Sequence, residues 1–285
     1  MAVEISYFKS AWNDIKHTPK WLGKVIKLAL LNLIPIFGQI VTLGYLYGWA
    51  RDIAWGVHQP LPDKILSNED GQLYRRGFFG LVVAFVIGLL PALISAVGDI
   101  LLGGGVVGVA SAHARYSVLG MSSVVIGEAL FLLALVANLA AYVFTPVGIM
   151  RMSIYNRLSA GLQLGRIWKM LRHDSRGALR IAVMAILAGI AAGFATSVLG
   201  ALAAAPFVGL FAASGMGAES VSVALLYSLG ALGAVFLLVF VLFSLGVVVF
   251  VNMLTVRAVG YWVFQFDVAH WGGQDDPMPF EGAAR

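Results

Sequence analysis

The chain has 285 residues, of which 60% are hydrophobic and 12% are charged, with a formal net charge of +5 at pH 7. A soluble domain carries about 25% charged residues, so this composition excludes an ordinary soluble protein and indicates a helical integral membrane protein. The chain contains no cysteine, which excludes disulfides, Cys-based zinc sites and thiol chemistry.

Residues 5–17 predict an amphipathic helix at the start of the chain. Their apolar residues recur at the spacing of one helix face. These residues are Phe8, Ala11, Trp12 and Ile15. Lysines fill the other faces, so we expect the helix to lie on a membrane surface with its Trp at headgroup depth. Thr18 precedes a proline and is predicted to cap the following helix.

Residues 24–53 form an apolar segment that is interrupted at Pro35 and Gly38. Pro35 lacks an N–H and disfavours a helix through this point, and Gly38 accepts turn conformations. Each half is about ten residues long, which is too short to span a bilayer. We therefore favour a re-entrant or half-depth hairpin, and the alternative is an ordinary crossing with a proline kink.

Four later segments are long and apolar enough to span a bilayer, because each exceeds the ~20 residues that a crossing needs. They are residues 78–102, 124–150, 179–202 and 226–256. The connection at 151–180 holds seven basic residues, whereas the connections on either side of it are nearly free of them. The positive-inside rule then predicts an inner cell membrane protein with both termini in the cytoplasm, provided that the broken segment turns back. With that turn, eighteen basic residues lie inside and one outside; with a crossing, the split is thirteen to six.

Residues 157–173 predict a second amphipathic helix, which resembles the first at an offset of 156 residues. Trp12 aligns with Trp168, and basic or histidine residues align at four further positions. We interpret this as an internal repeat, and the alternative is that basic surface helices beside membrane spans look alike for physical reasons. Five basic residues of these segments are candidates for contact with lipid headgroups: Arg166, Lys169, Arg172, Lys16 and Lys20. The alternative is that these charges only set the orientation of the chain.

Polar residues are scarce within the spans. Glu128 and Asp99 lie toward the outer ends of their spans, near Arg115, and together they are candidates for a proton or cation site. The alternative is an interfacial position with water contact. Gly189 and Gly193 form a small-xxx-small pair, which predicts helix packing within the bundle or, alternatively, a homo-oligomer face.

The segment from residue 19 to 63 holds a set of spaced residues: Pro19-Lys20-Trp21, Ile34-Pro35 with Gly38, Gly44-Tyr45, Arg51, Gly56 and Leu61-Pro62. With these residues the segment resembles the domain-of-unknown-function 4013 family of prokaryotic multi-pass membrane proteins. The stretch 157–171 is also similar to that family, and the resemblance extends to about Asp267. It implies a multi-pass membrane architecture and carries no activity to transfer.

The sequence as a whole predicts an all-α polytopic helix bundle. Residues 1–267 form a single membrane domain, and residues 268–285 form a flexible acidic tail. No catalytic motif, metal-ligand set or cofactor motif occurs, so we expect neither an enzyme nor a bound metal or cofactor. Nucleic acid is not an expected partner, because most basic residues flank membrane spans. We expect a lipid-interacting or membrane-organising protein that associates with the bilayer and its anionic lipids; the alternative is a small-solute or ion permease that uses Glu128 and the helix break at Pro35.

Overall fold

The computed structural model describes residues 6–68, 70–110, 114–215 and 223–282, without the side chains of 105–119, 210–226 and 229. No strand occurs in these ranges, and the chain is all-α as predicted. The helices are α1 (Tyr7–His17), α2 (Trp21–Leu31), α3 (Phe37–Ala54), α4 (Leu73–Ala110), α5 (Ala114–Tyr155), α6 (Leu158–Gly161), α7 (Leu164–His173), α8 (Ser175–Gly215), α9 (Val223–Phe264), the 3-10 turn η1 (Val268–His270) and α10 (Pro279–Gly282).

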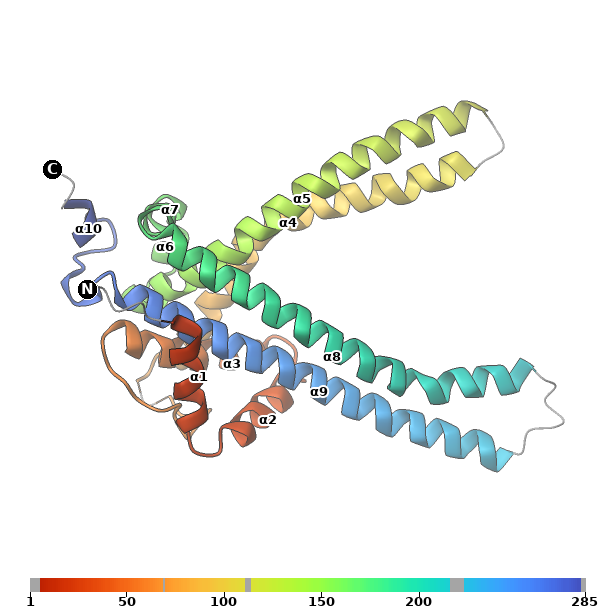
Figure 1. Cartoon of the computed structure of the whole chain (residues 1–285), viewed down its shortest axis with the longest axis horizontal. Coiled ribbons are helices and arrows are strands. Elements are labelled where there is room, and N and C mark those ends of the chain that lie inside the picture. The colour runs from red at the N-terminus through yellow and green to blue at the C-terminus, as the bar shows by residue number, and fades with distance from the viewer. Residues whose placement is uncertain (1–5, 69, 111–113, 216–222, 283–285) are drawn as a thin grey trace.

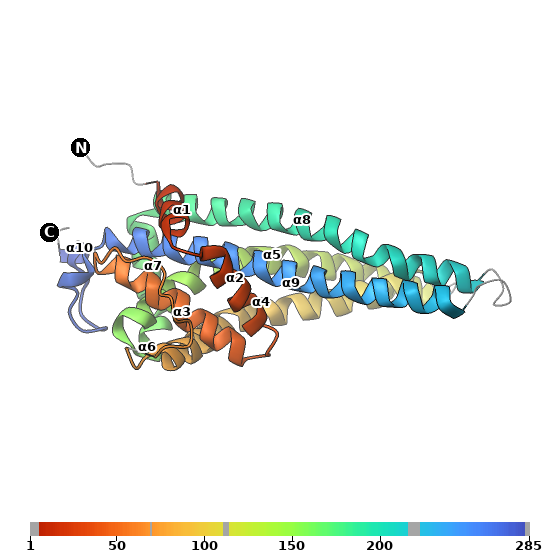
Figure 2. The ribbon, with the colours of Figure 1, turned by 90° about the horizontal axis from the view of Figure 1, so that it is seen from below.

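Two long helical hairpins diverge from a common base and give the molecule the shape of a V (Figure 1). We call α4–α5 and α8–α9 the two arms, and we call their common base, with the shorter helices, the head. Figure 2 shows both arms extending in the same direction from the head, and both ends of the chain lie at the head. Four helices among the described residues are long and apolar enough to cross a membrane, in agreement with the four predicted spans: Leu73–Gly104, Gly120–Tyr155, Ser175–Gly209 and Gly230–Phe264.

The proline-broken segment turns back on itself between α2 and α3. The amide of Asn32 donates to Thr42 Oγ1 across the turn at 2.9 Å. Ile36 has a φ of 64°, and the Phe37 N–H donates to the Pro35 carbonyl at 2.6 Å, which makes a tight γ-turn. A Cβ at Gly38 would overlap the Leu31 carbonyl oxygen, so the close approach of the two helices requires glycine there. The helix break was therefore predicted correctly.

Backbone-to-backbone packing fixes α3 within the head. A Cβ at Gly77 of α4 would overlap the Ile40 carbonyl oxygen of α3, and one at Gly260 of α9 would lie 2.6 Å from the Ala50 carbonyl oxygen. The glycine pair predicted for packing, Gly189 and Gly193, has no neighbouring heavy atom within 4 Å of either Cβ position. That prediction was wrong for packing among the described residues, because both glycines are exposed on α8 and face open space.

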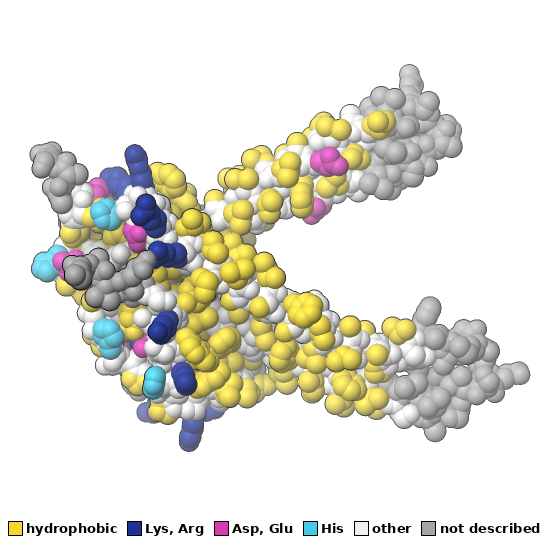
Figure 3. Space-filling view, viewed as in Figure 1, with side chains coloured by type: hydrophobic (Ala, Val, Ile, Leu, Met, Phe, Trp, Pro, Cys, Tyr) yellow, Lys and Arg dark blue, Asp and Glu magenta, His cyan; other side chains and the backbone are white. Residues whose placement is uncertain are grey.

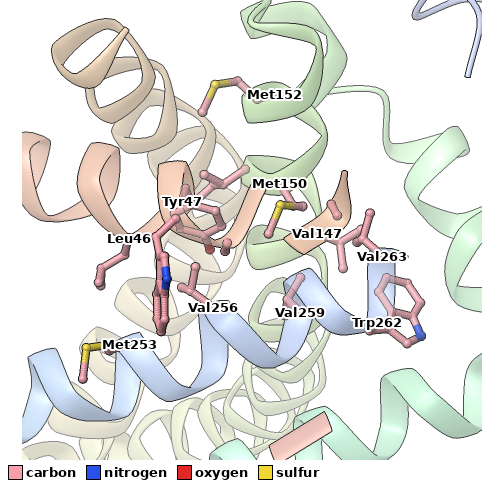
Figure 4. Close-up of a cluster of buried hydrophobic side chains, with 14 of the residues drawn as sticks. Leu46, Tyr47, Val147, Met150, Met152, Met253, Val256, Val259, Trp262 and Val263 are labelled. Atoms are coloured by element: carbon pink, nitrogen blue, oxygen red, sulfur yellow. The ribbon is translucent and has the colours of Figure 1, made fainter. Parts of the chain in front are cut away.

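The core of the molecule lies in the head, where α3 meets α5 and α9 (Figure 4). Leu46 and Tyr47 of α3 belong to one buried cluster with Met150 of α5 and with Val256 and Trp262 of α9. The arms beyond the head contribute few buried side chains, since most of their large apolar residues are exposed. This distribution suits a protein whose arms are solvated by lipid rather than by water.

The first predicted amphipathic helix forms as α1, whereas the second, predicted over 157–173, is interrupted at residues 162–163 and forms α6 and α7; all three lie in the head. α1 buries Ala11 and Ile15, and α7 buries Ile167, Met170 and Leu171. Asp174 caps α8, because its carboxylate accepts the Gly177 N–H at 3.0 Å.

The predicted cap at Thr18 was wrong. Its hydroxyl donates to the Asp14 carbonyl at 2.8 Å and accepts the Leu61 N–H at 3.2 Å. Lys20, with a φ of 54°, is the residue that precedes α2. Thr18 therefore ends α1 and anchors the segment that follows α3, rather than starting α2.

The C-terminal segment 268–282, which we call the tail, differs from the flexible tail that composition predicts. Val268 and Met278 are buried in the core, and Phe280 stacks on His173 with ring centroids 4.5 Å apart. The Glu281 carboxylate accepts hydrogen bonds from Arg166 at 2.9 Å and Lys169 at 2.8 Å. Acidic and apolar side chains of the tail thus find complementary partners on α7, which composition alone does not reveal.

Candidate functional site

Three buried arginines lie where the spans enter the head. Arg76 of α4, Arg151 of α5 and Arg257 of α9 are 4%, 1% and 0% exposed, respectively. Arginine is rarely this buried unless its guanidinium is paired or fully hydrogen-bonded. From the sequence, these arginines were counted only among the basic residues that flank the spans. Their structural role was not predicted.

Arg257 ties the first helix of the chain to the last span. Its Nε and Nη2 each lie 2.7 Å from the Asp14 carboxylate of α1. Its Nη1 donates to the Trp49 carbonyl at 2.6 Å, and its guanidinium lies 4.0 Å from the centre of the Trp49 ring. Tyr261 adds a hydrogen bond to Asp14 at 2.8 Å. One ion pair therefore joins α1, α3 and α9.

Arg151 is held by neutral groups. Its Nη2 donates to the Gln163 side-chain oxygen at 3.0 Å, and its guanidinium lies over the rings of Tyr155 and Trp271 at 5.4 and 5.6 Å. Because Trp271 belongs to the tail, Arg151 links α5 to the tail. Its role is structural, since it joins elements of the head.

Arg76 and Asp70 form a close ion pair at one wall of a polar cavity of about 390 Å³ in the head. Most residues of its lining bear polar or aromatic groups, among them Tyr45, Trp49, Arg51, Asp52, Asp70 and Arg76. Burial by itself would raise the pKa of the Asp70 carboxyl, but hydrogen bonds from the Gln72 N–H and from Arg76, together with the charge of Arg51, hold that pKa below its ordinary value. The cavity is thus lined by charged groups that are already paired with one another.

The segment 57–65 covers this cavity and is pinned by hydrogen bonds to its neighbours. Trp49 donates to the Gln59 carbonyl at 2.9 Å, and Tyr45 donates to the Pro62 carbonyl. Lys24 of α2 is buried and donates to the Leu61 carbonyl at 2.6 Å. These bonds anchor the segment to α2 and α3, although few of its side chains are buried.

A second concavity, of about 670 Å³, lies beside the polar cavity between α2 and residues 63–67. We call it the lateral groove. Its lining combines apolar and charged side chains: Lys27, Leu30, Leu31, Asp63, Lys64 and Leu66. Asp63 and Lys64 also line the polar cavity, so the two concavities are neighbours.

The five predicted headgroup contacts fall into two groups. Arg166 and Lys169 of α7 bind Glu281 of the tail, so this part of the predicted lipid contact is covered within the chain. The side chains of Lys16, Lys20 and Arg172 are exposed at the head. Sequence alone cannot distinguish these groups, because the acid that covers α7 lies more than a hundred residues away.

The predicted polar cluster at the outer ends of the spans is not assembled in the part of the chain that the structure describes. Glu128 and Asp99 are both exposed on the α4–α5 arm, and neither makes an ion pair with another described side chain. The side chain of Arg115 lies outside the described residues. An acidic residue of a transport pathway is enclosed by protein or by a water-filled cavity. The exposed positions of Glu128 and Asp99 differ from such a site.

Metal binding finds no support in the described ranges, where no three His, Asp or Glu side chains come together in a group that could hold a metal ion. The chemistry that the head offers is therefore recognition by charge, hydrogen bonding and apolar contact. The exposed cations of the head border the exposed apolar surface of the arms, as Figure 3 shows.

Comparison with known families gives one match, to the family described as "Protein of unknown function (DUF4013)", over residues 27–201. The match begins within α2 and contains the turn between α2 and α3, all of α3, the α4–α5 arm, both surface helices α6 and α7, and most of α8. It ends before Asp267, to which the resemblance in the sequence was expected to extend. No curated protein and no solved structure matches the chain. Because the matched stretch covers more than half of the chain and contains the broken hairpin, this multi-pass membrane protein belongs to the DUF4013 family.

Proposed function

We propose that this protein binds phospholipid at the headgroup level of the membrane and thereby organises the lipid around its head. The observation that carries the proposal is the direct border between the apolar arms and the Lys and Arg side chains on the visible face of the head (Figure 3). Exposed apolar helices require lipid around them, and the cations at their base then meet the phosphates of the same lipids.

Charge supports a preference for anionic lipid. Each Lys or Arg near an anionic membrane surface contributes about 1 kcal/mol to binding. Lys16, Lys20 and Arg172 are exposed and lie on or next to the two amphipathic helices. A transport function gains no comparable support, because the Glu128 side chain is exposed on one arm and is not enclosed by other described helices.

Charge reversal tests this proposal. The triple variant Lys16→Glu, Lys20→Glu and Arg172→Glu should lower the share of anionic phospholipid that co-purifies with the protein by at least about fivefold. The matched control, Lys16→Arg with Lys20→Arg and Arg172→Lys, keeps every charge and should retain the lipid of the original protein. Equal anionic lipid in the charge-reversed and control proteins would contradict the proposal.

We further propose that the head lies on the cytoplasmic side of the inner membrane, with both termini there. The basic connections and the turned-back hairpin support this orientation through the positive-inside rule. Because the chain has no cysteine, single substitutions can be labelled against a clean background. A membrane-impermeant maleimide applied to intact cells should label Ser111→Cys, between α4 and α5, and should not label Lys9→Cys or Ser175→Cys. Labelling of Lys9→Cys would place α1 outside and overturn this orientation.

A further inference from the structure

The turn between α2 and α3 carries an exposed apolar surface, which we call the hairpin tip (residues 33–37). Four of its large apolar side chains are exposed: Leu33, Ile34, Ile36 and Phe37. Ile34 and Ile36 are 51% and 63% exposed, respectively. The sequence holds no charged residue from position 28 to position 50. Turns that face water are built mainly from Gly, Asn, Asp and Ser, so the composition of the tip favours contact with lipid over contact with water.

Polar groups at the turn are paired within the hairpin, as a lipid environment requires. The Asn32 side chain donates to the Leu28 carbonyl at 2.8 Å and to Thr42 Oγ1 at 2.9 Å. The Ile34 N–H donates to the last carbonyl of α2 at 3.0 Å, and Pro35 has no N–H to pair. The turn can therefore enter an apolar medium without leaving these donors unpaired.

A contact with α9 places the hairpin beside the apolar length of a span. Val25 of α2 packs against α9 at Gly246, where a Cβ would lie 4.0 Å from Val25 Cγ1. Gly246 precedes Arg257 by eleven residues, which is about 16 Å of helix. Arg257 lies where the last span enters the head, so α2 runs beside a part of α9 that lies in the membrane. Figure 2 shows the turn on the side of the head from which the arms extend.

A contact with α4 limits the depth that the tip can reach. The Phe37 ring stacks on Tyr74 with ring centroids 6.3 Å apart, and Tyr74 lies only two residues before Arg76, where α4 enters the head. The 11 residues of α2 are about 16 Å long, against ~30 Å for the hydrocarbon core of a bilayer. The two contacts together confine the tip to a single leaflet.

We infer that the hairpin tip inserts among the acyl chains of the leaflet on the side of the head, and that the lipid of this leaflet is its partner. Ile34 and Ile36 contact the chains. Lys27, the nearest charged residue before the tip, lines the lateral groove and extends its flexible side chain toward the headgroups. The inference rests on the part of the proposed function that places the head at the headgroup level. It gives that function a means, because the tip displaces lipid from one leaflet only.

Depth-dependent fluorescence quenching tests this inference in the full-length protein. Because the chain has no cysteine, Ile34→Cys can carry a single thiol-reactive fluorophore. The labelled protein is reconstituted in phosphatidylcholine vesicles in which some of the lipid bears a nitroxide on the headgroup, at the middle of an acyl chain or at the chain end. The mid-chain nitroxide should quench the Ile34→Cys label at least about twofold more than the headgroup or chain-end nitroxide.

Two control positions calibrate the depth. Val86→Cys of α4 is exposed ten residues beyond Arg76, about 15 Å along the helix, and should be quenched most by the chain-end nitroxide. Ser175→Cys is exposed on the head at the start of α8 and should be quenched most by the headgroup nitroxide. Leu33→Cys repeats the measurement at a second position of the tip, and circular dichroism checks that each variant retains its helices.

The quenching patterns decide between the alternatives. Tip labels that behave like Ser175→Cys would place the tip outside the acyl chains, and tip labels that behave like Val86→Cys would place it at the middle of the bilayer; either result overturns the inference. Tip labels that no nitroxide lipid quenches would show that protein, and not lipid, covers the tip, which also overturns it. The vesicles contain no anionic lipid, so mid-chain quenching would support the inference even if the charge-reversed and control proteins co-purified with equal anionic lipid, a result that contradicts the proposed function alone.

Discussion

Removal of the Asp14 carboxylate should destabilise the whole head, because it leaves the charge of Arg257 buried without an ionic partner. Arg257 is fully buried, and in Asp14→Asn it loses the carboxylate charge that its Nε and Nη2 contact at 2.7 Å. Breaking a buried ion pair in this way costs about 3–5 kcal/mol. We expect the lower end, about 3 kcal/mol, because Arg257 keeps its bond to the Trp49 carbonyl and its contact with the Trp49 ring.

Thermal unfolding in detergent measures this loss. For a chain of this size, 1 kcal/mol changes Tm by about 2–4 °C, so Asp14→Asn should lower Tm by about 6–12 °C. The matched control is Asp267→Asn, the same substitution at an exposed acid, which should lower Tm by less than about 3 °C.

A double variant separates buried charge from lost packing. In Asp14→Leu/Arg257→Met both charges are absent, so at least half of the lost stability should return. Two results would refute the reasoning: a Tm for Asp14→Asn no lower than that of the control, or a double variant that is less stable than Asp14→Asn.

Three further predictions concern the tail, the helix contacts and the hairpin turn. Burial would raise the pKa of Glu281, but the hydrogen bonds that its carboxylate accepts from two basic side chains lower this pKa below the ordinary 4.5. The ionised carboxylate therefore stabilises the tail fully above pH 4.5, and this stabilisation is lost as the pH falls through the lowered pKa. Glu281→Gln at pH 7, and acidification of the original protein through the lowered pKa, should both increase hydrogen exchange of the tail; unchanged exchange in the variant would show that the ion pairs do not hold it. Gly77→Ala forces a methyl group into the backbone of α3 and should cost about 1–3 kcal/mol in unfolding experiments, whereas Gly193→Ala meets open space and should cost nothing measurable. Ile36→Gly should raise the stability of the detergent-solubilised protein by about 1 kcal/mol, because it relieves the positive φ, while Ile34→Gly should lower it or leave it unchanged.

Hydropathy and local pattern determine the elements of this protein. The four spans, the first amphipathic helix and the helix break at Pro35 all follow from residues close together in the chain, and the structure confirms each of them. Such features are predictable because a helix in lipid satisfies its own backbone hydrogen bonds, so its existence depends on its own residues. The Asp174 cap of α8 is equally local, since its bond reaches only to Gly177.

The failures concern contacts between distant segments. Gly189 and Gly193 have the spacing of packing glycines, but the helix partners are decided by the way the hairpins diverge, and Gly77 and Gly260 make the close contacts instead. The composition of the tail predicts disorder, but its Glu281 forms ion pairs with Arg166 and Lys169 of α7. In each case a local pattern fits more than one environment.

Charge shows this division most clearly. The sequence alone fixes how many basic residues surround the spans, and hence the topology that they favour. Tertiary structure alone decides that Arg257 is buried and paired with Asp14, 243 residues away. It also decides that Arg166 pairs with the tail and that Lys27 lines an open groove. The physical reason is that the cost of a charge depends on its burial and its partner, and both are set by packing between segments that the chain order does not bring together.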